Sequence, residues 1–252
     1  MIYFLLLIIS ISVNAKNITI IAASKREDVN WLHELKHKLD NLNDNNNYDI
    51  KIYRPNEPNY IYTTEYEKGF EACMYLKYII DYYDNLSDYN LFIHAHRSSW
   101  HSRDMLNYIP RIDWYRLTYH NINVDHFQKI ELHKNDNIVN LMKLITEKVY
   151  KEIPPFVNGY CCAQFIVTKE LILRHKKEIY EDLNTLLREN HLQNHQSSRS
   201  FEYLWGYIFT HIHDMEAYDN GLCSFINCTE NEYKDKNINF KLLGYQVWNK
   251  KI

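Results

Sequence analysis

The sequence contains very little glycine, with five residues in a chain of 252. It has neither a Gly-x-x-x-x-Gly-Lys-Ser/Thr loop nor a Gly-x-Gly-x-x-Gly fingerprint. Both motifs need glycine wherever the backbone approaches a phosphate. A Gly-x-Ser-x-Gly nucleophile elbow is also missing, so a serine hydrolase of the α/β class is not supported. These absences set aside P-loop, classical NAD-dependent and α/β serine-hydrolase chemistry.

The sequence also has no excess of basic residues. Lysine and arginine together number 29 against 32 acidic residues, which gives a formal net charge of -3, and the two signs are mixed along the chain. A nucleic-acid partner is therefore not expected, because such binding needs a basic face. With 46% hydrophobic residues the chain can bury a full core, and we expect one globular domain over residues 16–252.

Cysteine is scarce, and no Cys-x-x-Cys pair occurs among the five residues of this type. The absence of such a pair argues against a zinc ribbon or a thioredoxin-like motif. In an oxidising compartment some of the cysteines should pair, and a bond between Cys223 and Cys228 would close a short loop. For the adjacent Cys161 and Cys162 we expect a bridge or a buried pair rather than a catalytic nucleophile.

One long apolar run is present, at residues 1–15, and it ends in the small residues Val13 and Ala15. This pattern predicts a signal peptide cleaved after Ala15, and hence a secreted or lumenal protein without a stable membrane span. A buried first strand or helix and an uncleaved anchor are the alternatives, although no Lys or Arg precedes the run. The secretory route predicts N-glycosylation at three sequons, which begin at Asn17, Asn85 and Asn227.

Hydrophobic periodicity alternates between strand and helix along the first part of the chain. Strands are predicted at 18–23, 48–53 and 90–96, and helices at 27–42 and 70–83. This order predicts a single three-layer α/β domain with a mostly parallel sheet flanked by helices. Further along, we expect an irregular segment at 104–137, a helix at 138–150, a strand at 163–167, a long helix capped by Thr168, and a helix at 200–213.

The stretch "LFIHAHRSSWH" places three histidines at and beyond the end of the third predicted strand. Residues two apart in a strand share a face, so His94 and His96 are expected to project together, with His101 joining from the loop. Imidazoles suit zinc, manganese or iron, and Asp104 and Asp113 are near enough in sequence to contribute. The alternative is that the histidines bond to backbone or substrate. Either role fits the carboxyl edge of a parallel sheet, where ligands bind.

Five other residues are candidates for binding or catalysis. Trp100 either stacks on a sugar or base or anchors its loop in the core. Arg97 and Arg103 either hold a diphosphate or carboxylate or face solvent. Glu71 and Glu202 lie in apolar surroundings near predicted helix starts, where a carboxyl group serves as a base or substrate-binding group, or simply complements the helix dipole.

Four blocks of the sequence resemble a mostly fungal family known as domain of unknown function 3431. They are "IIAASKREDVNWL", "KGFEACMYLKYIIDYYDNLSD" leading into "LFIHAHRSSWH", "CCAQFIVTKELI" and "FEYLWGYIF". The blocks occur in the family's order and span about residues 17–209. This resemblance implies no particular activity.

The layout also resembles nucleotide-sugar glycosyltransferases of the GT-A type. That resemblance implies a nucleotide-sugar or carbohydrate partner, with Asp28 near the donor nucleotide, the loop 94–101 at the diphosphate, and Glu202 as the base. Those enzymes hold a metal through Asp-x-Asp, where this chain has His94-Ala95-His96. Either the histidines replace the aspartates around manganese or zinc, or Arg97 and Arg103 neutralise the leaving group without a metal.

Three functions follow from these patterns. The first is transfer of a sugar from a nucleotide-sugar. The second is a non-catalytic carbohydrate-binding or structural protein that kept such a fold. The third is a metal-dependent hydrolase, in which the histidine cluster holds an ion that activates water.

Overall fold

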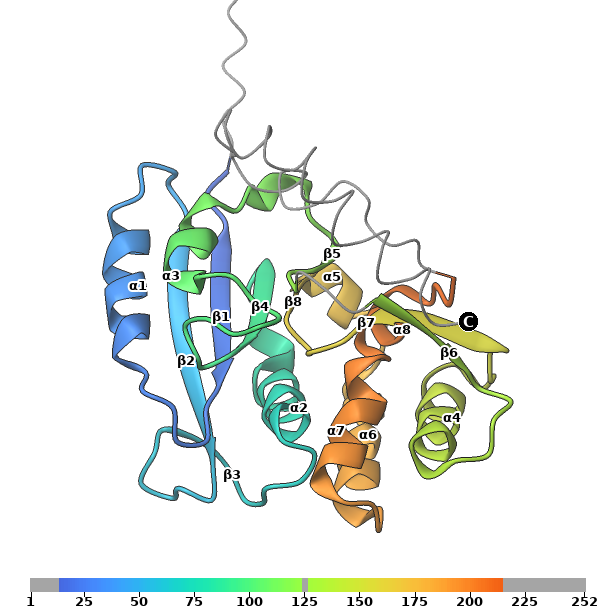
Figure 1. Ribbon diagram of the computed structural model, residues 1–252. Helices are drawn as coiled ribbons and strands as arrows, with labels where there is room; N and C mark the ends of the chain where they lie inside the picture. Colours follow the sequence, from blue (N-terminus) through green and yellow to red (C-terminus); the bar gives the residue numbers. More distant parts are fainter. Residues whose placement is uncertain (1–13, 124–126, 215–252) are drawn as a thin grey trace, which may run out of the picture.

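The computed structural model describes residues 14–123 and 127–214, which fold around a six-stranded sheet flanked by helices (Figure 1). In spatial order the strands are β3 (Tyr62–Thr64), β2 (Asn47–Pro55), β1 (Asn17–Ala23), β4 (Tyr89–His94), β8 (Phe165–Thr168) and β5 (Tyr119–Asn121). The first four run parallel, and β8 is antiparallel to both of its neighbours. The predicted α/β class with a mostly parallel sheet is confirmed.

Helices cover both faces of the sheet because β1 is apolar on both sides. Ile20 and Ala22 belong to the core cluster on the side of α1 (Asn30–Asp40) and α3 (Met105–Tyr108). Ile21 and Ala23 belong to the cluster that contains α2 (Glu71–Tyr82). A continuous apolar strand is typical of a sheet buried on both faces.

A second group of elements extends the core on the α2 side of the sheet (Figure 1). It consists of β6 (Phe127–Glu131), α4 (Asn137–Tyr150), β7 (Phe156–Tyr160), α5 (Lys169–Ile172), α6 (Lys177–Glu189), α7 (Asn194–Glu202) and α8 (Trp205–Thr210). β6 and β7 form an antiparallel pair of their own. A Cβ added at Gly159 of β7 would lie 2.6 Å from the Tyr203 carbonyl oxygen, so the link between α7 and α8 packs directly on this pair.

Several predicted boundaries were wrong. β4 ends at His94, two residues earlier than expected. The segment 104–137, where we expect loops with short elements, contains α3, β5 and β6 and short 3-10 helices at 109–111 and 114–116. The helix expected after Thr168 is split into α5 and α6, since His175 turns inward and its Nε2 lies 2.7 Å from the Ile208 carbonyl oxygen. The helix expected at 200–213 is the end of α7 followed by α8.

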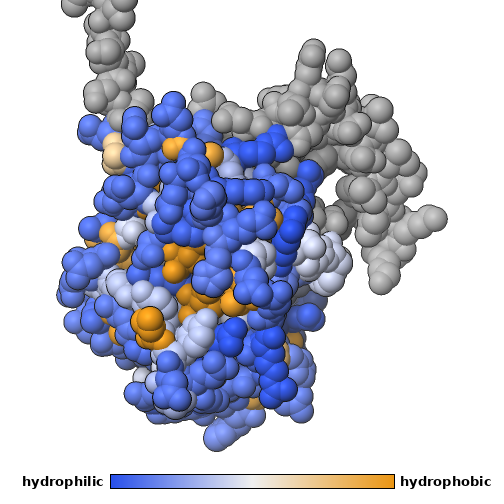
Figure 2. All heavy atoms as spheres, turned by 90° about the vertical axis from the view of Figure 1, so that its left-hand side faces the viewer, coloured by the Kyte–Doolittle hydropathy of each residue, from blue (hydrophilic) through white to orange (hydrophobic). Residues whose placement is uncertain are grey.

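The predictions of a signal peptide, of glycosylation at Asn227 and of the Cys223–Cys228 bond concern residues that lie wholly or almost wholly outside the described ones. Asn17 and Asn85 are exposed, at the start of β1 and after α2. Among the described residues, no helix is long and apolar enough to span a membrane. The face that carries α1 is mostly hydrophilic, with a small apolar area near its centre (Figure 2).

Candidate metal centre

The histidines gather where β1 and β4 end side by side. His94 is the last residue of β4 and pairs with Ala23 of β1, and the Ala95 N–H donates to the Ala23 carbonyl at 2.9 Å. The indole Nε1 of Trp31 donates to the Ala95 carbonyl at 2.7 Å and holds the start of the loop. His96 therefore projects from a loop that leaves the sheet, rather than from the strand that the sequence suggested.

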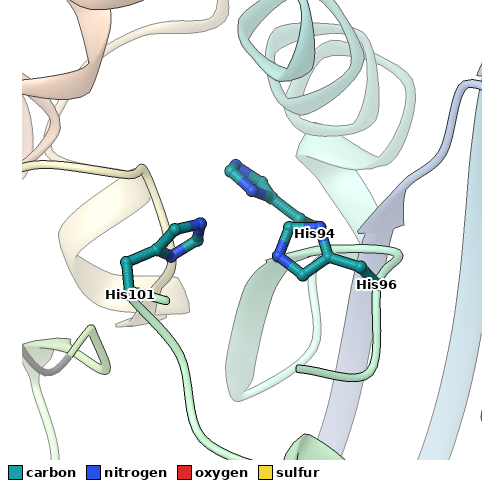
Figure 3. A group of neighbouring side chains, drawn as sticks. All are labelled: His94, His96 and His101. Carbon is teal, nitrogen blue, oxygen red and sulfur yellow. The ribbon is translucent and has the colours of Figure 1, made fainter. Parts of the chain in front are cut away.

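The three imidazole rings face a common space (Figure 3). The ring centroids of His94 and His96 are 5.1 Å apart, and those of His101 lie 5.5 Å from His94 and 5.4 Å from His96. One ring nitrogen from each residue lies within 4.8 Å of the others. Zinc bonds of about 2.0–2.1 Å bring ligand nitrogens to roughly 3.4 Å from one another. Small rotations of the rings therefore suffice to close around an ion.

The environment keeps the imidazoles of His94 and His96 neutral, which is the form that binds metal. Burial, with help from His96 and His101, lowers the pKa of His94 to about 3. Burial and His101 also lower the pKa of His96. Within the described part of the chain, the Nε2 atoms of both residues are buried and have no hydrogen-bond partner. Buried polar atoms are nearly always satisfied, so these two nitrogens are candidate ligand atoms for a metal ion.

Two carboxamides support His101, which is itself buried. Its Nδ1 lies 3.1 Å from Asn123 Oδ1 and 3.3 Å from Gln164 Nε2, and Gln164 Nε2 donates to Asn123 Oδ1 at 2.9 Å. The 3.1 Å contact to Asn123 is a hydrogen bond when Nδ1–H of His101 donates, because an amide oxygen can only accept a hydrogen bond. We assign this tautomer, which leaves Nε2 of His101 as the ligand atom.

The loop between His96 and His101 is fastened by its own polar groups. Arg97 makes a two-pronged salt bridge with Asp104, at 2.7 and 2.6 Å. The Asp104 carboxylate also accepts from the Leu106 N–H and so caps α3, while Asp113 accepts from the Tyr115 N–H in the same way. Both aspartates thus serve the local fold, and neither belongs to the group of potential ligands formed by the histidines.

A cavity of about 250 Å³ opens beside the histidines. Its lining comprises Ala23, Lys25, Glu27, Pro55, Glu67, Phe70, Glu71, Met74, His94 and His96. Glu71 is the first residue of α2 and is buried. Burial raises the pKa of Glu71 to about 7, with a further rise from Glu202 and an opposing effect of the Ser198 hydroxyl, which donates to Oε1 at 2.7 Å.

Glu202 ends α7 and lies next to a disulfide between Cys161 and Cys162. The Cys162 N–H donates to its carboxylate, and burial raises the pKa of Glu202 against the effect of that hydrogen bond. The two sulfurs and a carboxylate oxygen lie within 4.8 Å of one another. The sulfurs are bonded together and offer no thiolate, so this group is not a metal site in the oxidised chain.

The remaining candidates lie at the rim of this region or outside it. Asp28 is exposed and accepts from the Asn30 N–H at 2.9 Å at the start of α1. Arg97 and Arg103 are exposed, and Arg97 is engaged by Asp104. Trp100 is 68% exposed and meets the edge of His101 with ring centroids 4.9 Å apart. None of these four residues lines the cavity.

Sequence reasoning missed six residues of the site: Lys25, Glu27, Glu67, Phe70, Asn123 and Gln164. Lys25 and Glu27 follow the first strand as His101 follows the third, and the carboxyl ends of parallel strands share an edge, so their position was available as a signal. Asn123 follows β5 and Gln164 precedes β8, two strands whose place in the sheet the sequence did not reveal.

Comparison with known proteins places the chain in a family. Residues 19–231 match the family described as protein of unknown function (DUF3431), and the chain belongs to it. No curated protein and no solved structure matches the chain.

Proposed function

We propose that this member of the DUF3431 family is a metal-dependent hydrolase whose ion is held by His94, His96 and His101. The observation that carries the proposal is the convergence of three imidazole nitrogens within 4.8 Å of one another. In the described structure, Nε2 of His94 and Nε2 of His96 are also buried without a hydrogen-bond partner. Catalytic zinc sites use three protein ligands and leave a fourth position for water. The cavity lined by His94 and His96 provides room for that water and for a substrate.

Zinc suits the site better than manganese. The donor set consists of nitrogen atoms alone, and imidazole favours zinc, copper, iron or nickel, whereas manganese prefers carboxylate and water oxygens. The support of His101 by Asn123 Oδ1 at 3.1 Å is the kind of contact that orients a ligating imidazole. When bound, the ion would acidify a water molecule and polarise the group under attack.

Glu71 is the group in the cavity best suited to accept the proton of that water. A general base works best with a pKa near the working pH, and burial gives Glu71 a pKa of about 7. The Ser198 hydroxyl donates to Oε1 at 2.7 Å and fixes the orientation of the carboxyl group. Glu71 lines the cavity and Glu202 does not, which makes Glu71 the better candidate for the base.

The first test is the metal content of the purified chain, measured by mass spectrometry after dialysis against zinc and manganese together. About one zinc per chain is expected in the wild type, with loss in His94→Ala and His101→Ala. His133→Ala is the matched control, since that side chain is 72% exposed. Turnover of ester substrates that requires zinc and falls in Glu71→Gln supports the hydrolase. A wild-type chain that binds no metal contradicts it.

A nucleotide-sugar glycosyltransferase is the second candidate. It is favoured by the place of the site, at the carboxyl end of β4 in a mostly parallel sheet, with the antiparallel β8 beside it, a layout similar to the GT-A type. In that reading the histidines hold manganese or zinc at the donor diphosphate and Glu202 is the base. Slow release of sugar from a UDP- or GDP-sugar, without turnover of simple esters, would favour this candidate over the hydrolase.

A further inference from the structure

The cavity beside the histidines combines an apolar side with a carboxylate side. Ala23, Pro55, Phe70 and Met74 contribute the apolar part of the lining. The carboxyl groups come from three residues, Glu27, Glu67 and Glu71, and the ammonium group comes from Lys25. The cavity measures about 250 Å³, which is below the ~300–1,000 Å³ typical of sites for larger organic ligands. One six-membered ring with its substituents is a ligand of suitable size.

Phe70 is held at this cavity by an uncommon backbone conformation. Gly69 has φ +67° and Phe70 has φ 48°. A side chain at Gly69 is disfavoured by the positive φ and by crowding, because an added Cβ would lie 2.5 Å from Leu187 Cδ1. Bulky residues rarely adopt positive φ, and such a conformation persists only where the surrounding structure holds it, which is often the case at ligand sites. Phe70 stays 38% exposed while the next six residues of α2 are buried.

The charges of the lining disfavour an anionic ligand. Lys25 Nζ lies 2.5 Å from Glu67 Oε1, so the ammonium group is already paired, and it also lies 5.9 Å from the centre of the Phe70 ring. Glu27 accepts from the backbone N–H groups of Lys25 and Arg26 at 2.6 and 3.0 Å. The Glu71 carboxyl group accepts from Ser198. A phosphate placed here would meet three acidic side chains, whereas hydroxyl groups would find acceptors.

We propose that this cavity binds a neutral sugar ring, with Phe70 stacked on the apolar C–H face of the ring and the carboxyl groups of Glu27, Glu67 and Glu71 accepting its hydroxyls. The inference deepens the proposed function and rests on it for the role of the site, since the sugar would lie against the metal centre. A neutral sugar derivative, such as an esterified sugar, is then the substrate class. The binding itself needs no turnover and can be measured separately.

The test uses saturation-transfer NMR on the full chain loaded with zinc. The probes are the methyl glycosides of glucose, galactose, mannose and N-acetylglucosamine, with UDP as the anionic comparison. At least one glycoside is expected to receive saturation, and UDP none. In Phe70→Ala the affinity for that glycoside should fall about threefold to tenfold, the range that an aromatic contact of ~0.5–1.5 kcal/mol gives. Phe70→Trp should keep the binding, because the flat apolar face is retained.

Leu144→Ala is the matched control, because Leu144 is a 51% exposed apolar residue on α4, outside the cavity lining. Circular dichroism of each variant verifies folding. The inference is overturned if no glycoside binds, if binding is unchanged in Phe70→Ala, or if UDP alone binds. The metal assay separates this result from the proposed function. If the chain binds a glycoside but no zinc, the sugar site stands and the proposed hydrolase function is contradicted. If it binds zinc but no glycoside, the metal centre stands and the sugar site is contradicted.

Discussion

The side-chain carbonyl of Gln164 accepts a hydrogen bond from the backbone N–H of His94 at 3.1 Å. The NH₂ group of the same side chain donates to Asn123, which supports His101. One fully buried glutamine thus links two of the three histidines from opposite sides. The histidines come from one strand and the loop after it, and Gln164 fixes this loop relative to the antiparallel strand β8.

Gln164→Ala is expected to lower zinc affinity tenfold to a hundredfold, the usual cost of losing a residue that orients metal ligands. The measurement is competition with a chromophoric chelator, with circular dichroism to verify folding. Gln128→Ala on the partly exposed strand β6 serves as the matched control. Unchanged zinc affinity in Gln164→Ala would show that the carboxamide only fills space.

Asn123→Leu should also lower the zinc affinity, but for a different reason. Asn123 Oδ1 is the acceptor that keeps the proton on His101 Nδ1, and its NH₂ group donates to the Cys161 carbonyl at 2.8 Å. Without that acceptor the imidazole loses its preferred tautomer, and Nε2 is no longer held ready for metal. Nitrogen-15 spectra of the histidine rings provide the direct measurement. Asn140→Ala serves as the control. If His101 keeps its Nδ1 proton in Asn123→Leu, the role assigned to Asn123 in fixing the tautomer is wrong.

The prediction of the fold succeeded for long elements with a clear hydrophobic pattern and failed for short ones. β1, β2, β4, α1 and α2 give clear apolar patterns, and their alternation indicated the parallel sheet. β3 and β5 have three residues each, too few for a pattern. The reversed direction of β8 depends on tertiary pairing, and no local feature of its sequence encodes it.

The site was predictable in its histidines and less so in its surroundings. The spacing of His94 and His96 suggested a shared direction, although the reason is the loop geometry and not a strand. The inward position of Glu71 follows from packing between α2 and α7, where Ser198 meets the carboxyl group. The sequence does not show that Glu71 rather than Glu202 lines the cavity, because this depends on how the helices pack in the assembled core.

The C-terminus of α4 offers a test of the fold that is independent of function. Lys151 follows the helix with φ 62° and ψ 23°, a left-handed conformation, and it is exposed. Glycine adopts this conformation without a Cβ penalty, so Lys151→Gly should raise the free energy of unfolding by ~0.5–1 kcal/mol. Glu147→Gly, four residues earlier on the exposed side of the helix, should lower it by about 1 kcal/mol. Urea denaturation measures both changes, and a destabilised Lys151→Gly would mean that α4 ends elsewhere.

The carboxyl group of Glu71 should make stability fall as the pH rises. Its pKa is raised by burial from 4.5 to about 7 in the folded chain, so between these values the folded state binds more protons than the unfolded state, and stability declines with pH. Below the lower value no penalty exists, and above pH 7 the full penalty of roughly 3 kcal/mol applies.

Glu71→Gln should remove this contribution, so that the variant gains stability relative to the wild type between pH 5 and pH 8 in the metal-free chain. Urea denaturation at several pH values provides the measurement. A difference between the two proteins that stays constant with pH would mean that Glu71 titrates normally, and the base assigned to the hydrolase would then have to be sought elsewhere.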